Sequence, residues 1–164
     1  ITIFRPISGA HFNPAVTLYM VLSGQIAQNR ATLYCIAQVA GALCAVPLTH
    51  AMFGEDLLQI ATTDRSAPRL WLSEAVATFG LLFVIVGGTR SARAQVAALA
   101  GAWVAAAYWF TASSIFGNPA VTLARMFTDT FTGIKPMDAP GYILAQLGAA
   151  SLAWLVLPRL FGKD

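Results

Sequence analysis

The sequence HFNPAVTL at residues 11–18 occurs again as FGNPAVTL at residues 116–123. In both copies Asn is followed by Pro, which predicts a helix start because Asn is a favoured N-cap and Pro is preorganised for the first helical position. Each copy opens a short apolar stretch, at 14–24 and 119–128. Because about 20 apolar residues are needed to cross a bilayer, stretches of this length indicate re-entrant half-helices.

A second match in the same order indicates that the chain contains a duplicated unit. The sequence YCIAQ at residues 34–38 is similar to YILAQ at residues 142–146, an offset of 108 positions where the first match has 105. Two ordered matches at nearly one offset are the signature of an internal repeat. We predict that each unit consists of two helices, an Asn-Pro-Ala half-helix and a final helix.

The composition predicts a protein of the lipid bilayer. Of 164 residues, 57% are hydrophobic and only 10% are charged, whereas soluble domains carry about 25% charged residues. Four nearly uncharged segments are long enough to span a membrane, at 31–53, 70–88, 94–116 and 140–157. The net charge of +3 does not indicate nucleic-acid binding, because the Lys and Arg residues are scattered and form no basic stripe.

The repeat offset also indicates how much of the first unit the chain contains. Ile1 aligns with Ala106, which lies 36 positions after Leu70, the start of the second unit's first span. We therefore expect residues 1–53 to be a partial first repeat and residues 70–162 a whole second one. The full protein would have six spans, of which about four and a half are present within the single domain 1–164.

Three spans per unit would place the two units in opposite orientations, so the predicted fold class is an all-α membrane protein with an inverted repeat. The charge distribution assigns its sides. One side holds Arg5, Arg30, Arg90, Arg93, Arg159 and Lys163, and the other holds Glu55, Asp56, Asp64, Asp129 and Asp138 among fewer cations. By the positive-inside rule the first side is cytoplasmic, and the C-terminus with it.

The segments 8–17 and 117–122 resemble the two signature motifs of the aquaporin, or major intrinsic protein, family. Segments 34–41 and 74–79 are similar to family patterns on the third and fourth spans, so the resemblance covers essentially the whole chain. It implies a passive channel for water and small uncharged solutes, without enzyme activity or cofactor. It further implies a homotetramer in a cytoplasmic membrane and a bacterial branch of the family.

The two half-helices, each opened by an Asn-Pro-Ala tripeptide, are expected to form the centre of the pore. Facing half-helices would direct their positive dipole ends at one point, which opposes the passage of cations. Their capping amides would donate hydrogen bonds to an uncharged solute. The tripeptides are Asn13, Pro14 and Ala15, and Asn118, Pro119 and Ala120.

The residues before each cap are expected to be non-helical. Irregular backbone at membrane depth is tolerated only inside protein or beside a wet cavity, so these residues should line the pore with carbonyl oxygens. They are Gly9, Ala10, His11, Phe116 and Gly117. His11 is open to two interpretations, a ligand or titrating gate and a structural histidine beside the pore; we expect the second, and no metal site.

Val121 stands where most family members place the arginine of the selectivity filter. By spacing, the other filter positions fall at Ala106 and Ile115. This filter is wider and more apolar than one containing Arg, so we expect it to admit neutral solutes larger than water. Glycerol is one such solute, and metalloid hydroxides of the arsenite type are others, since the sequence resembles an arsenic-resistance-associated branch. Arg125 either substitutes in part for the missing cation or pairs with Asp129.

Three polar residues within the spans are expected to support the structure. An ionisable residue inside a membrane is a functional candidate by default, and Glu74 is the acid within a span. The family resemblance implies that it accepts hydrogen bonds from the loop before Asn118; a proton-coupled transporter is the alternative. Gln38 and Gln146 are expected to form interhelical hydrogen bonds.

Two other functions remain open at this point. One is a structural membrane protein that uses the same fold for packing. The other is a non-conducting fragment, since the first repeat is incomplete. No arrangement of residues typical of an enzyme is found in the sequence, and Cys35 and Cys44 match no metal-ligand or disulfide pattern.

Overall fold

The computed structural model describes residues 1–162, and the regular elements in that part of the chain are all helical. Three helices are long and apolar enough to cross a membrane. They are α3 (Gln28–Phe53), α4 (Pro68–Ser91) and α7 (Ala139–Phe161). A four-residue helix, α1 (Arg5–Ser8), precedes them. Lys163 and Asp164 lie outside the described residues.

The half-helices are α2 (Pro14–Leu22) and α6 (Pro119–Ala124), and α6 continues into a 3-10 turn, η2 (Arg125–Phe127). Each begins with an extended Asn whose side-chain oxygen accepts a hydrogen bond from the backbone N–H two residues on, at 2.8 Å in α2 and 3.0 Å in α6. The following Pro has no N–H that would need a partner. Both half-helices therefore start where the sequence predicts, and α2 ends two residues earlier than expected.

The predicted span 94–116 is wrong at its C-terminal end. The helix there, α5 (Val96–Phe110), follows a 3-10 turn, η1 (Arg93–Gln95), and stops at Phe110. The Thr111 hydroxyl donates to the Ala107 carbonyl and accepts from the Ile115 N–H at 3.1 Å. Positive φ angles at Ser114 (58°) and Ile115 (32°) then turn the chain out of helical geometry.

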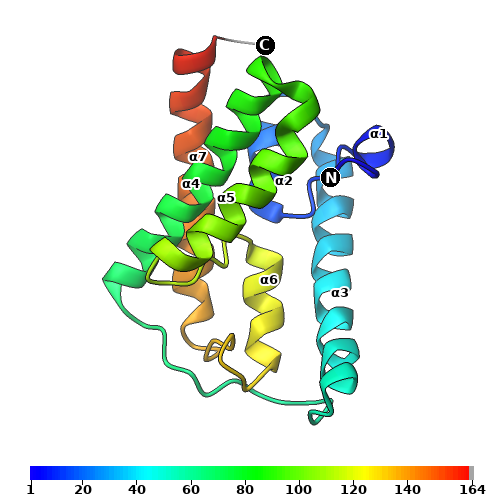
Figure 1. Ribbon diagram of the computed structural model, residues 1–164, viewed down its shortest axis with the longest axis vertical. Helices are drawn as coiled ribbons and strands as arrows, with labels where there is room; N and C mark the ends of the chain where they lie inside the picture. The colour runs from blue at the N-terminus through cyan, green and yellow to red at the C-terminus, as the bar shows by residue number, and fades with distance from the viewer. Residues whose placement is uncertain (163–164) are drawn as a thin grey trace.

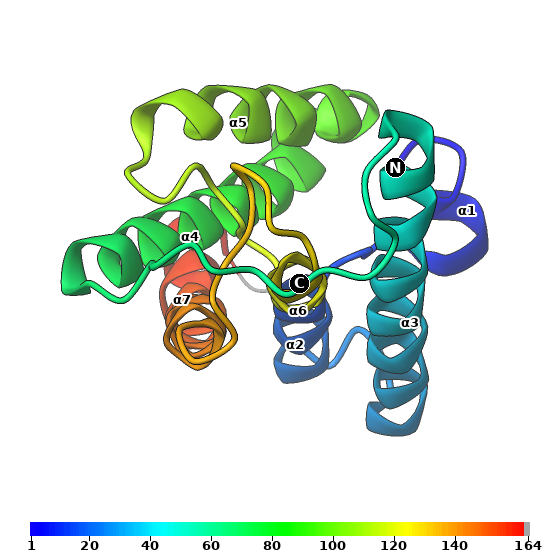
Figure 2. The same ribbon diagram turned by 90° about the horizontal axis from the view of Figure 1, so that it is seen from below.

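The helices surround the two half-helices. Figure 1 shows α6 below α2, with α3 on one side and α4 and α7 on the other, and in Figure 2 α2 and α6 overlap along the viewing direction. Each half-helix packs against both α3 and α7, the last helices of the two repeats. The half-helices thus contact their own repeat and the opposite one alike, as an inverted repeat requires.

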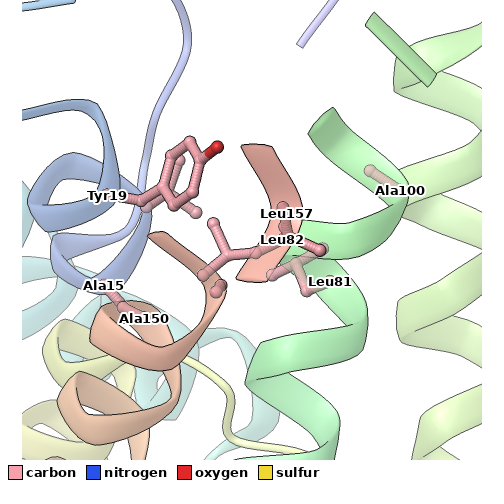
Figure 3. Packing of buried hydrophobic residues seen from close by; sticks show 9 residues of the cluster. Ala15, Tyr19, Leu81, Leu82, Ala100, Ala150 and Leu157 are labelled. Carbon is pink, nitrogen blue, oxygen red and sulfur yellow. The ribbon is translucent and has the colours of Figure 1, made fainter. Parts of the chain in front are cut away.

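The main hydrophobic core joins α2, α4, α5 and α7. Figure 3 shows Ala15 and Tyr19 of α2 beside Ala150 of α7, with Leu81 and Leu82 of α4 to their right. Small side chains at the contact allow helices to approach closely in a membrane. The approach of α5 to α4 is closer still, because a Cβ added at Gly80 would lie 1.9 Å from the Trp103 ring.

Candidate pore-lining site

The side-chain amides of the two capping asparagines are crossed. Asn13 Nδ2 donates to the carbonyl of Gly117 at 2.7 Å, and Asn118 Nδ2 donates to the carbonyl of Phe12 at 2.9 Å. Each amide therefore binds the backbone of the residue that precedes the other cap. Because an amide nitrogen carries two N–H donors, one donor of each asparagine remains after this bond.

The backbone directly before each cap has a left-handed conformation, with φ 49° at Phe12 and 57° at Gly117. This region is uncommon for a residue with a Cβ, so Phe12 carries a conformational cost that glycine avoids. The two carbonyls placed in this way are the acceptors of the crossed amides. The strain at Phe12 is thus part of the contact between the half-helices.

A cavity of about 810 Å³ passes both asparagines. Its central wall consists of the re-entrant loops, with Gly9, Ala10, His11, Phe12, Ile115, Phe116 and Gly117. Within residues 1–162, the carbonyls of Gly9, Ala10, His11, Ile115 and Phe116 accept no hydrogen bond. A polar molecule in the cavity therefore finds backbone acceptors as well as the remaining amide donors.

Of the three predicted filter positions, two line the cavity and one does not. Val121 and Ile115 line the cavity. Ala106 is exposed on α5 and does not line it; the α5 wall is formed instead by Ala97, Ala100, Gly101 and Val104. These four residues lie at helical spacing on one face, and Ala106 lies off that face. The filter position that spacing predicts at Ala106 is therefore not among the residues that line the cavity.

Glu74 is fully buried, and three donors surround its carboxylate. The backbone N–H groups of Phe116 and Gly117 donate to it at 2.9 and 2.8 Å, and Gln146 Nε2 donates at 2.6 Å. A buried carboxylate is tolerated when its oxygens are satisfied in this way. Glu74 thus holds the loop that precedes Asn118 against α4 and α7.

The two glutamines occupy equivalent places in the two repeats. Gln38 Nε2 of α3 donates to the Thr17 hydroxyl of α2 at 3.0 Å, and Gln146 Nε2 of α7 donates to the Thr122 hydroxyl of α6 at 2.9 Å. Each bond joins a half-helix to the last helix of its own repeat. Gln146 bonds to Glu74 as well, whereas the Gln38 side-chain oxygen has no partner among the described residues.

Both histidines are held by neighbouring groups. His11 Nδ1 lies 3.3 Å from the Thr17 hydroxyl, and its ring contacts Tyr34 edge-on with centroids 5.5 Å apart. His50, whose role the sequence does not reveal, is buried at the end of α3, with Nε2 2.9 Å from the Thr128 hydroxyl. In residues 1–162 no three His, Cys, Asp or Glu side chains are grouped as a metal site would require.

The predicted pairing of Arg125 with Asp129 is wrong. The Asp129 carboxylate accepts from the Thr62 N–H at 2.8 Å and from its hydroxyl at 2.9 Å. Arg125 lines the cavity instead, with its guanidinium carbon 4.2 Å from the centroid of the Phe116 ring. Arg125 lies a full helical turn beyond Val121 in the sequence. Its side chain nevertheless extends back to Phe116 in the loop before Asn118, and the sequence alone does not reveal this direction.

The comparison with known proteins agrees with this geometry. A sequence profile described as major intrinsic protein matches residues 1–111. Aquaglyceroporin AqpS of Rhizobium meliloti is 50% identical over 96% of this chain and 70% of its own length. Aquaporin NIP2-2 of Zea mays is 38% identical over 91% of this chain, and aquaporin-5 of Ovis aries is 25% identical over 93%.

This chain spans about half the length of the plant and sheep relatives, 52% and 56% respectively. The profile covers more than half of the chain, and the similarity to AqpS extends through both half-helices. The fold, with its inverted repeat and short helices that meet at their capped ends, is consistent with both comparisons. The chain belongs to the major intrinsic protein family.

Proposed function

We propose that the protein is a passive channel for small uncharged solutes. The observation that carries this proposal is the cavity of about 810 Å³, which passes both capping asparagines and is lined by free backbone carbonyls. Residues of the two Asn-Pro-Ala motifs and of the loops before them are then the pore-lining residues. Two relatives named aquaglyceroporin and aquaporin support the same activity.

The electrostatics of the site favour neutral solutes over cations. The N-terminal ends of α2 and α6 face each other, and each helix end carries about half a positive charge. A cation would lose hydration there and meet a positive potential, whereas a neutral hydroxyl could donate to a carbonyl and accept from an amide. No bond is made or broken by such a site, so the protein would not be an enzyme.

The lining beside Val121 supports solutes larger than water. Val121 and Ile115 contribute apolar side chains, and the α5 wall consists of Ala, Gly and Val. Glycerol fits this description, and arsenite-type metalloid hydroxides have a similar size and polarity. We further propose the division into repeats 1–53 and 70–162, a cytoplasmic C-terminus in the inner membrane and a homotetramer, each on the grounds given from the sequence.

The test is solute flux through the full-length protein in lipid vesicles. Stopped-flow light scattering would measure shrinkage and re-swelling with water, glycerol, urea and arsenite, with protein-free vesicles as the control. We expect water and glycerol fluxes well above the control. If all four solutes crossed no faster than in the control vesicles, a structural or non-conducting protein of this fold would be the correct interpretation.

A further inference from the structure

Arg125 reaches the centre of the cavity wall although its backbone lies at the end of α6. Val121 and Arg125 are four residues apart and therefore share one face of this half-helix turn. Side chains of a helix lean toward its N-terminus, and arginine is long enough to cover the preceding turn. The contact of its guanidinium with Phe116, two residues before the Asn118 cap, shows that it does so. The short Val121 side chain leaves room for this path.

A second arginine, Arg65, lies over the same Phe116 ring and provides a comparison for the hydrogen bonding of Arg125. Arg65 also lies over Phe116, at 5.2 Å, but its Nε donates to the Gly133 carbonyl at 2.7 Å and its Nη2 to the Phe131 carbonyl at 2.9 Å. Arg65 does not line the cavity. Its donors are used to hold the loop after η2, so its position has a structural explanation.

The donors of Arg125 have no such partner. Within residues 1–162 its guanidinium makes neither a hydrogen bond nor an ion pair, and it lies over the ring of Phe116. A cation–π contact of this kind gives no hydrogen-bond acceptor to the N–H groups of a guanidinium. The N–H donors of Arg125 are therefore available to a molecule in the cavity.

We propose that the edge of Arg125 is a solute-binding subsite of the channel, which binds neutral molecules with two neighbouring oxygen atoms. Two parallel N–H groups match two adjacent oxygens, as in a vicinal diol, and a hydrogen bond to a charged group is stronger than one between neutral groups. The inference rests on the proposed function for its effect on flux. The positive charge repels cations, and it places that barrier beside Val121.

The surrounding carbonyls explain why the ligand is neutral rather than anionic. The unpaired carbonyl oxygens of Ile115 and Phe116 lie in the same wall as the guanidinium. A hydroxylated solute can accept from Arg125 and donate to these oxygens at once. An anion without an O–H group would face their lone pairs with nothing to donate, and burial of its charge would not be compensated.

Binding can be tested independently of conduction. The full-length protein in nanodiscs, with ¹⁵N-labelled arginine, would be titrated with ethylene glycol and with 1-propanol, which has the same number of heavy atoms but one oxygen. The Arg125 Nε resonance is assigned by its loss in Arg125→Lys. We expect ethylene glycol to shift this resonance saturably and 1-propanol to leave it in place; no shift with the diol, or equal shifts with both, would overturn the subsite.

Flux supplies the second arm of the test. Arg125→Met should lower the glycerol-to-water permeability ratio about tenfold, the order expected for losing one hydrogen bond to a charged group. Arg69→Met is the matched control, because it removes an exposed positive charge from the start of α4. An unchanged or increased ratio in Arg125→Met would show that Arg125 acts as a packing group or a plug.

The two arms separate this inference from the proposed function. A diol-dependent shift in a protein that conducts neither water nor glycerol would leave the subsite standing and refute the channel. Conduction of glycerol with an unmoved Arg125 resonance would do the reverse. If Arg125→Met failed to fold, Arg125→Lys would replace it in the flux assay, with a smaller fall in the ratio expected because the charge remains but the fork is lost.

Discussion

Glu74 and Gln146 are hydrogen-bonded at 2.6 Å between two side chains that are both fully buried. Gln146 also donates to Thr122 of α6, so the pair joins α4, α7 and the second half-helix in one polar network. A network of this kind fixes the position of the loop before Asn118, because every donor around the carboxylate has its acceptor there. Loss of the carboxylate would leave those donors buried and unpaired.

Glu74→Ala should therefore reduce the yield of folded protein before it alters selectivity. The substitution leaves the N–H groups of Phe116 and Gly117 without their acceptor, at a cost of about 1–3 kcal/mol for each unsatisfied group. Thermal unfolding in detergent and the monodisperse fraction on size exclusion would measure it, with the exposed Glu55→Ala as the control. A fully stable variant that leaks protons would contradict the scaffold role of Glu74.

Asn118→Asp separates the capping role of the side chain from its donor role. The carboxylate can still accept from the Ala120 N–H, so α6 keeps its cap, but the donor to the Phe12 carbonyl is replaced by an oxygen. We expect increased cation leakage and a loss of about 1–2 kcal/mol of stability. Potassium flux in vesicles and a thermal melt are the measurements.

Asn13→Asp is the matched variant for Asn118→Asp, because the Gly117 carbonyl loses its donor in the same way. The crossed arrangement predicts effects of the same sign at both positions. Leakage in one variant and none in the other would show that the two amides do not act as a pair.

Val121→Arg should depress the permeation of bulky neutral solutes more than that of water. The new guanidinium would occupy space beside Ile115 and bring a second positive charge close to Arg125. Stopped-flow rates for glycerol and water in the same vesicle preparation give the ratio, and Val121→Met controls for added volume without charge. A proportional loss of both fluxes would contradict a filter role for this position.

Acid should weaken the contact between the loops at 62 and 129. The Thr62 N–H and then its hydroxyl, both donating to Asp129, lower the pKa of this carboxyl below its ordinary value of 3.8. A carboxyl with a lowered folded-state pKa stabilises the fold above its unfolded pKa, and this stabilisation is lost as the pH falls through the folded value.

The measurement for the acid effect is the thermal midpoint at pH 6 and at about pH 3, compared between the parent protein and Asp129→Asn. The thermal midpoint of the variant should fall less between pH 6 and about pH 3 than that of the parent, because the amide in Asp129→Asn does not titrate. If the parent and the variant showed identical pH dependence, the hydrogen bonds from Thr62 would have no energetic role. The carboxylate is exposed, so we expect a modest effect.

The sequence predicts the elements better than it predicts the contacts between them. The Asn-Pro pairs place the starts of α2 and α6 correctly because capping is a local property of the chain. The end of α5 at Phe110 is missed, since residues 111–116 are as apolar or small as a spanning helix would be. Hydropathy cannot distinguish a helix from a loop that is buried at membrane depth.

The contacts missed at the site depend on side-chain paths. The amides of Asn13 and Asn118 bond to carbonyls more than 100 positions away in the sequence, and the pattern of residues contains no trace of this crossing. Asp129, four residues after Arg125, looks like its partner in the sequence, but the Asp129 carboxylate accepts from Thr62 instead. The sequence does not reveal the role of His50, because its partner Thr128 is 78 positions distant.

The packing of α2 against α7 and of α6 against α3 has a consequence for biogenesis. During synthesis α2 can pack against α3 early, but its contact with α7 forms only after α7, which begins at Ala139, has been translated. Neither repeat can therefore complete its packing alone. In a nascent chain that stalls before α7, the face of α2 that packs against α7 would stay uncovered. Packing of both half-helices is thus tied to completion of translation.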